Sequence, residues 1–164
     1  MNPNDPAYSY LEQLERMPEL NDAEADQLAF CLLSEGAGEA RRQLAQGHLR
    51  MAGLFAAEYA GRGIVLMDLI QAANQALIAS IDSFPEAKGA RFKDYASWRI
   101  RISIEDALGL WTIESRLVDA EKARGFGLID EMGLILDKCE ELASGLPNSQ
   151  LQLEQIARTR QLAI

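Results

Sequence analysis

Residues 66–84 read LMDLIQAANQALIASIDSF, a stretch without proline or glycine in which apolar side chains recur mainly at intervals of three and four. Because an α-helix turns once in about 3.6 residues, this spacing gathers them on one side of a helix. The other side carries acid and amide groups that suit water or a polar partner. The stretch predicts a helix buried along one stripe: Leu66, Leu69, Ile70, Ala73, Leu77, Ile81 and Phe84.

The segments around this helix also indicate helices. Alanine, leucine, glutamate and glutamine are frequent, and no long stretch alternates polar and apolar residues with a period of two. Asn21 and Glu24 have the spacing of a helix cap in which each residue bonds the backbone of the other. The sequence therefore predicts an all-α fold, with helices from Asn21 to a break at 36–38, over about 39–59, over 66–84, and from Asp94 through Trp111 after a loop at 85–89.

The overall composition favours a soluble protein that is neither secreted nor membrane-spanning. It is 48% hydrophobic and 25% charged, as in soluble globular proteins. No apolar run approaches the roughly 18 residues of a membrane span, and the N-terminus does not resemble a secretory signal. Cys31 and Cys139 lie far apart in helical sequence, and we expect both to be small buried residues in a reducing compartment. The expectation is a cytoplasmic protein without a membrane partner.

The sequence contains no cluster of residues that indicates catalysis. His48 is the single histidine, and the cysteines and carboxylates do not have the spacing of metal ligands. There is no glycine-rich phosphate loop, no nucleophile elbow and no Ser/His/Asp set. A lone histidine is far more often a surface or core residue than a catalyst. We therefore expect a protein that is not an enzyme and that has no cofactor and no metal site.

Charge is distributed unevenly along the chain. The formal net charge is −9, made of −8 over residues 1–40, +4 over 41–101 and −5 over 102–164. Binding to nucleic acid depends on cations that neutralise phosphates and release counterions. Any nucleic-acid contact should therefore lie within the basic middle block.

The middle block, from His48 to Ile104, resembles the second conserved region of bacterial RNA polymerase sigma factors of the sigma-70 family. The likeness extends without a gap through short motifs, and residues 8–47 are similar to the short helical region that precedes it, region 1.2. The motifs are LR at 49–50, Tyr59, RG at 62–63, DLIQ at 68–71, Asn74, Leu77, Asp82, Phe84, Gly89, RF at 91–92, YASW at 95–98 and IR at 100–101.

This resemblance implies a division of the chain into two parts. Residues 1–111 would form a helical domain like sigma-70 regions 1.2 and 2. Residues 112–164 are acidic and too short for the further sigma domains, so we expect a helical C-terminal extension on a truncated and divergent member of the family.

The resemblance also implies a partner, core RNA polymerase. In the family, the helix that carries DLIQ docks on the coiled coil of the largest polymerase subunit. The residues outside the apolar stripe would form this surface, although the family usually has an acid and a glycine where Ala72 and Ala73 stand. The predicted polymerase-binding residues are Met67, Asp68, Gln71, Asn74, Gln75 and Ile78.

A second implied surface contacts promoter DNA. Aromatic side chains of the segment that follows stack on bases of the minus-ten element in the family, and stacking on one base contributes about 1–3 kcal/mol. Packing of these same aromatic residues in the core remains the alternative. The predicted DNA-binding residues are Arg91, Phe92, Lys93, Tyr95, Trp98, Arg99 and Arg101.

Several substitutions weaken this second surface. Ala90 stands where the family usually has an aromatic residue, and Arg99 replaces the second tryptophan of a pair. Ile102 and Glu105 occupy positions that read the minus-ten element, and they are followed by Asp106. An isoleucine cannot hydrogen-bond to a base edge, and carboxylates repel phosphate. We therefore expect weak or altered contact with promoter DNA.

Two functions follow from these expectations. The first is a sigma-like factor that binds core polymerase and acts in transcription initiation or its regulation. The alternative is a sigma mimic that does not read DNA and either binds an anti-sigma factor or competes for polymerase.

Overall fold

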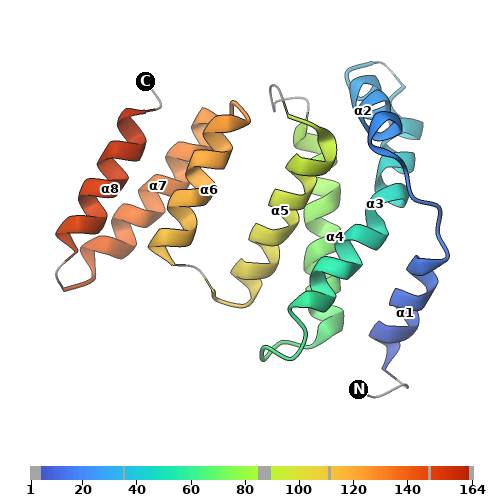
Figure 1. The fold of residues 1–164 in the computed structure, drawn as a ribbon, viewed down its shortest axis with the longest axis horizontal. Helices are drawn as coiled ribbons and strands as arrows, with labels where there is room; N and C mark the ends of the chain where they lie inside the picture. The colour runs from blue at the N-terminus through green and yellow to red at the C-terminus, as the bar shows by residue number, and fades with distance from the viewer. Residues whose placement is uncertain (1–4, 35, 85–89, 111, 148, 163–164) are drawn as a thin grey trace. The chain divides into compact units, whose positions relative to one another are not determined.

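The structure, a computed structural model, describes residues 5–34, 36–84, 90–110, 112–147 and 149–162. Within these residues it is built of helices alone, with no strand, which confirms the all-α class (Figure 1). The helices are α1 (Pro6–Glu15), α2 (Asp22–Cys31), α3 (Gly38–Glu58), α4 (Leu66–Ser83), α5 (Phe92–Ala107), α6 (Ile113–Gly125), α7 (Ile129–Ser144) and α8 (Gln150–Gln161).

The chain forms two compact units. The first contains α1–α5, and the second contains α6–α8. Gly109, at the end of the first unit, has a φ of +66°, a backbone conformation that glycine adopts readily and that ends α5. The assignment of residues 112–164 as an extension of a sigma-like domain stays a prediction, because compactness alone does not identify a segment.

The predicted apolar stripe of α4 lies in the core of the first unit. Leu69, Ala73 and Leu77 are fully buried, Leu66, Ile70 and Ile81 are also buried, and Phe84 is half-buried. The helices α3 and α5 pack against α4, and α1 contacts it less extensively. Burial of one large aliphatic side chain contributes about 1.5–3 kcal/mol, so the stripe is a major source of the unit's stability.

The ends of two helices confirm the sequence-based expectations. The Asn21 side chain accepts a hydrogen bond from the Glu24 backbone at 2.9 Å, and Glu24 accepts one from the Asn21 backbone at 3.1 Å. After α3, Gly61 and Gly63 have φ values of +79° and +99°. Residues with a Cβ atom rarely adopt such values, so the two glycines permit the turn between α3 and α4.

Two glycines inside α3 allow the N-terminal part of the chain to approach this helix closely. A Cβ atom on Gly47 would lie 2.5 Å from Cγ of Leu20, and one on Gly53 would lie 2.8 Å from a methyl group of Leu14.

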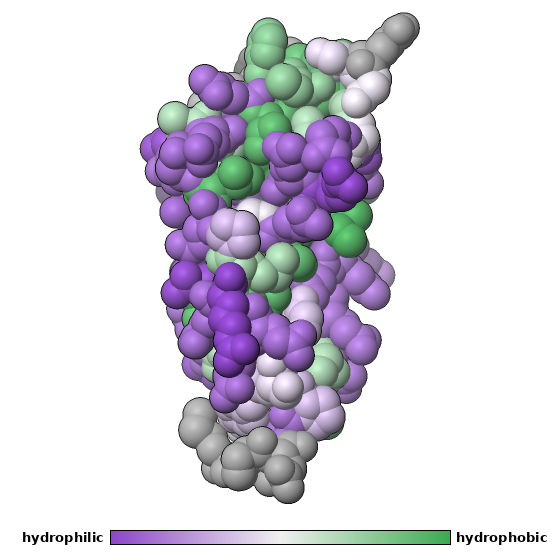
Figure 2. Space-filling view, turned by 90° about the vertical axis from the view of Figure 1, so that its right-hand side faces the viewer, coloured by the Kyte–Doolittle hydropathy of each residue, from purple (hydrophilic) through white to green (hydrophobic). Residues whose placement is uncertain are grey.

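Figure 2 views the side of the first unit on which α1 and α2 lie and shows a largely hydrophilic surface, with hydrophobic surface gathered toward the end where α2 lies. Phe30 and Leu33 are 76% and 68% exposed there.

Three sequence-based expectations are corrected. The helix that begins after Asn21 ends at Cys31, before the predicted break, and Cys31 is exposed rather than buried. The helix expected from Asp94 begins at Phe92 and ends at Ala107. Its predicted last buried residue, Trp111, and the whole of the predicted loop at 85–89 lie outside the described residues.

The second unit has its own small core. Its centre is made by the buried residues Met132, Leu136 and Cys139 of α7 with Ile156 of α8, and burial raises the pKa of the Cys139 thiol to about 11. Arg116 and Asp119 form a buried ion pair of 2.9 Å within α6. None of the helices in the described part of the chain is both long and apolar enough to cross a bilayer.

Candidate functional site

The outer side of α4 presents a continuous exposed stripe. Asp68, Gln71, Gln75 and Ile78 are all exposed, and their spacing of three, four and three residues places them on one helix face. Ile78 is 55% exposed. We call these four residues the α4 stripe. It offers one carboxylate, two amides and one apolar contact to a partner.

Met67 and Asn74 lie at the edge of the α4 stripe and are half-buried. The Asn74 amide nitrogen donates to the Tyr10 hydroxyl of α1 at 3.0 Å. The Asn74 amide oxygen is buried and has no hydrogen-bond partner among the residues that the structure describes. Of the six predicted polymerase-binding residues, the structure therefore presents four openly and holds two partly inside the unit.

The three predicted stacking residues of α5 lie in the core. Phe92 and Tyr95 are fully buried and Trp98 is 4% exposed. The Phe92 ring packs edge-on against His48 and Phe84 at centroid distances of 5.0 and 5.3 Å. This arrangement supports the alternative in which the rings pack the core. Base stacking by these rings stays a prediction, and it requires them to leave the positions described here.

Further contacts hold these rings in place. The Tyr95 hydroxyl lies 2.8 Å from the Ser83 hydroxyl at the end of α4. His48 Nδ1 donates to the Leu44 carbonyl oxygen at 2.8 Å, and burial lowers the pKa of the imidazole. A neutral histidine packed against Phe92 is a structural residue of this core. Among the described residues, no three His, Cys, Asp or Glu side chains gather where they could hold a metal ion.

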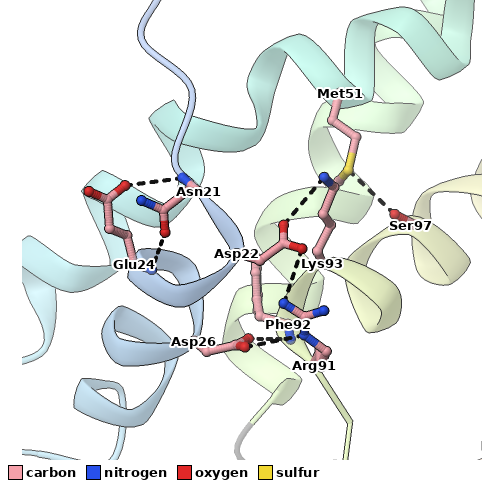
Figure 3. Close-up of polar contacts among 9 residues, drawn as sticks. All are labelled: Asn21, Asp22, Glu24, Asp26, Met51, Arg91, Phe92, Lys93 and Ser97. Atoms are coloured by element: carbon pink, nitrogen blue, oxygen red, sulfur yellow. Dashed lines mark hydrogen bonds and ion pairs between the residues drawn. The ribbon is translucent and has the colours of Figure 1, made fainter.

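The first cations of α5 are paired with carboxylates of α2 (Figure 3). Arg91 Nη2 lies 3.0 Å from Asp22 Oδ2, and Arg91 Nε lies 3.4 Å from Asp26 Oδ2. Lys93 Nζ lies 3.4 Å from Asp22 Oδ1. The Phe92 backbone nitrogen donates to Asp26 Oδ1 at 3.2 Å. We call these contacts between Asp22, Asp26 and residues 91–93 the α2–α5 clasp.

Two other arginines of the unit lie over aromatic rings. The Arg101 guanidinium lies 4.7 Å from the centre of the Phe55 ring, and that of Arg62 lies 4.9 Å from the Tyr59 ring. Both arginines are exposed. We call Arg62 and Arg101 the ring-supported arginines. Sequence analysis did not select Arg62, although the aromatic residue three positions before it gave a usable signal.

The remaining positions of α5 that were predicted to face DNA differ in their surroundings. Arg99 is half-buried, 5.9 Å from the centre of the Tyr95 ring. The Glu105 carboxylate accepts a hydrogen bond from the Tyr59 hydroxyl at 3.1 Å. Burial, with the hydrogen bond to Glu105 as the second cause, raises the pKa of Tyr59. A carboxylate thus stands beside Tyr59 at a position predicted to face DNA.

Comparisons with known proteins agree with the all-α fold, and they include α4 and α5, the two helices that carry the predicted surfaces. Residues 44–109 match the sigma-70 region 2 family, so most of α3 and all of α4 and α5 fall within the match. This confirms the resemblance read from residues 48–104. Over this region the chain is therefore similar to the sigma-70 family.

Curated relatives show the same relationship. The chain is 39% identical to the RNA polymerase sigma factor SigA of a Bacillus species over 105 residues, 64% of this chain and 28% of that protein. For SigA of Lactococcus lactis subsp. cremoris the identity is 37% over 107 residues, 64% of this chain and 29% of the relative. For SigA of Clostridium acetobutylicum it is 37% over 105 residues, with 64% and 28% covered. The chain thus spans less than a third of the length of these relatives.

Proposed function

We propose that this chain is a sigma-like factor that binds core RNA polymerase through α4 and acts in transcription initiation or its regulation. The observation that carries the proposal is the exposed α4 stripe within the sigma-70 region 2 match. The match to region 2 suggests the partner, and the stripe supplies residues that are open to it. The relatives named above are RNA polymerase sigma factors, which supports the same partner for this chain.

The chemistry of the stripe suits a pair of partner helices. Asp68 can accept hydrogen bonds or pair with a cation, and the amides of Gln71 and Gln75 can both donate and accept. Ile78 adds an apolar contact at the far end, and Val65, 63% exposed, adds another just before the first turn. A surface with apolar ends and a polar centre can bury apolar area against a partner and still fix the orientation in which the partner binds.

The test is retention of the chain on immobilised core polymerase. Asp68→Arg reverses the charge of the one carboxylate in the α4 stripe, and we expect retention to fall at least tenfold, which corresponds to a loss of more than about 1.4 kcal/mol of binding free energy. Retention would be measured by pull-down and by surface plasmon resonance with the full chain.

The control is Glu141→Arg, the same charge reversal at an exposed position of α7. It should leave retention unchanged. Because Asp68 lies in the first turn of α4, its reversal also loses about 0.3–1 kcal/mol of favourable interaction with the helix dipole. Circular dichroism melting of each variant separates this small loss of stability from a loss of docking. Unaltered retention of Asp68→Arg would remove α4 as the docking element.

We further propose that contact with promoter DNA is weak. The buried rings of Phe92 and Tyr95 support this, as do the carboxylates beside Arg91 and Lys93. The same observations favour the second candidate, a sigma mimic that occupies polymerase or binds an anti-sigma factor without reading DNA. In the first case the chain, added to core polymerase, promotes melting of a minus-ten promoter; in the second it displaces a sigma factor and melts none.

A further inference from the structure

We propose that Asp22 and Asp26 compete with nucleic-acid phosphate for the start of α5, so that α2 lowers the DNA affinity of the region 2 unit. The inference rests on the proposed function, because it takes DNA to be the ligand of α5. It adds a regulatory contact between the N-terminal part of the chain and the segment that would meet DNA.

The α2–α5 clasp has the chemistry of a phosphate contact. Two carboxylates make contacts of 3.0–3.4 Å with three consecutive residues: the Arg91 guanidinium, the Phe92 backbone nitrogen and the Lys93 ammonium. A phosphate group prefers the same donors: an arginine fork, a lysine and the free amides of a helix start. The carboxylates therefore occupy the positions that phosphate oxygens would take.

The clasp is open enough to be displaced. The exposed fractions of the side chains are 56% for Arg91, 54% for Lys93, 44% for Asp22 and 41% for Asp26. Ion pairs at such exposure are individually weak and are screened by salt. A bound strand, which presents several phosphates at once, can replace them. The clasp would therefore lower the affinity of α5 for DNA without blocking this helix permanently.

The two carboxylates have different secondary roles. Arg91 is the N-cap of α5, and its side chain makes no capping hydrogen bond. Asp26 supplies the missing cap to the Phe92 nitrogen from another helix, so it also stabilises the fold. The contacts of Asp22 in the clasp are with the two cations only, at 3.0 and 3.4 Å. Asp22 is thus the position at which competition can be removed while the cap stays.

The experiment measures binding of a fluorescein-labelled single-stranded oligonucleotide containing a minus-ten sequence, by fluorescence anisotropy over a series of salt concentrations. Asp22→Asn keeps the shape of the side chain and removes its charge. At low salt we expect the full-length variant to bind about two- to tenfold more tightly than the wild type, since two exposed ion pairs are relieved. The slope of log K against log salt should steepen by about 0.7 for each additional phosphate that the variant neutralises.

Glu24→Gln is the matched control. Glu24 lies on the same helix, faces the Asn21 backbone in Figure 3, and loses the same charge in this variant. Glutamine retains the capping geometry. Glu24→Gln should bind like the wild type, and Asp22→Asn combined with Arg91→Gln should lose most of the increase in affinity. Equal increases for Asp22→Asn and Glu24→Gln would overturn the proposal, because they would reflect net charge alone.

The outcomes separate this inference from the proposed function. If the wild type and Asp22→Asn bind the oligonucleotide equally, the competition is refuted and the DNA contact stands. If neither binds at low salt, the inference and the DNA part of the proposed function fail together. Retention on polymerase, which depends on α4, is measured independently.

Discussion

Asn74 lies at the edge of the α4 stripe, and its amide nitrogen donates a hydrogen bond to the Tyr10 hydroxyl at 3.0 Å. This hydrogen bond connects α1 to the helix proposed to bind polymerase. Within the described part of the chain the buried amide oxygen of Asn74 has no partner, so the side chain already lacks one of its hydrogen bonds there. A buried amide that loses its remaining contact costs the full desolvation of the group.

We expect Tyr10→Phe to lower the free energy of unfolding by about 1–2 kcal/mol, because it removes a hydrogen bond and leaves the Asn74 amide unpaired. The measurement is urea unfolding followed by circular dichroism. Tyr8→Phe is the control, since Tyr8 packs against the same core from the same helix and no hydrogen bond of its hydroxyl is found among the described residues. Equal effects of the two variants would show that the Tyr10–Asn74 bond contributes nothing.

At the scale of single residues, the sequence predicted exposure but not tertiary partners. Helical spacing alone placed Asp68 and Gln71 outside the buried stripe, because they lie on the far side of a 3.6-residue turn. It could not place Tyr10 beside Asn74 or Asp22 beside Arg91, because those partners lie 64 and 69 positions away along the chain. Local patterns carry no information about contacts over such separations.

Among the elements, α3 is the one on which the N-terminal segment packs most extensively. Gly47 lies in its middle, where glycine destabilises a helix by about 1 kcal/mol relative to alanine. The structure gives the reason for its presence: a Cβ atom would lie 2.5 Å from Cγ and 3.2 Å from Cβ of Leu20. The chain between α1 and α2 therefore approaches α3 more closely than any larger residue allows.

Gly47→Ala tests this close approach. We expect a net loss of about 1–2 kcal/mol in the free energy of unfolding, because the overlap with Leu20 costs more than the gain in helix propensity. Gly38→Ala is the control at the first residue of the same helix, where a Cβ atom would meet nothing within 4 Å. That variant should be neutral or slightly more stable. Stabilisation by Gly47→Ala in thermal melts would contradict the packing described here.

Contacts between helices also explain why some of the predicted helix bounds were wrong. The existence of α3, α4 and α5 followed from composition and apolar spacing, and the cap at Asn21 followed from a local motif. The start of α5 could not be read locally, because its cap is the Asp26 side chain of α2. Caps supplied by another helix have no signature in the sequence next to the helix they stabilise.

For the whole molecule, the charge distribution limits any contact with DNA. The chain carries −9 overall, and its positive block is confined to residues 41–101. Within that block, Arg41 pairs with Asp82, Arg42 with Glu39, and Arg91 and Lys93 with α2. The ring-supported arginines, Arg62 and Arg101, are exposed and lie over aromatic rings, and contact with a ring face leaves a guanidinium able to pair with phosphate.

Binding of single-stranded DNA by the wild type should therefore be weak and carried largely by the ring-supported arginines. Two phosphate contacts give a slope of about −1.4 in log K against log salt. We expect Arg62→Gln with Arg101→Gln to reduce this slope by more than half in anisotropy titrations. Arg41→Gln with Arg42→Gln removes the same charge from α3 and should leave most of the slope in place, because those arginines already have carboxylate partners. A wild-type slope several times steeper would mean that residues 91–93 or the buried aromatic segment of α5 also meet the strand, and that the α2–α5 clasp opens without help.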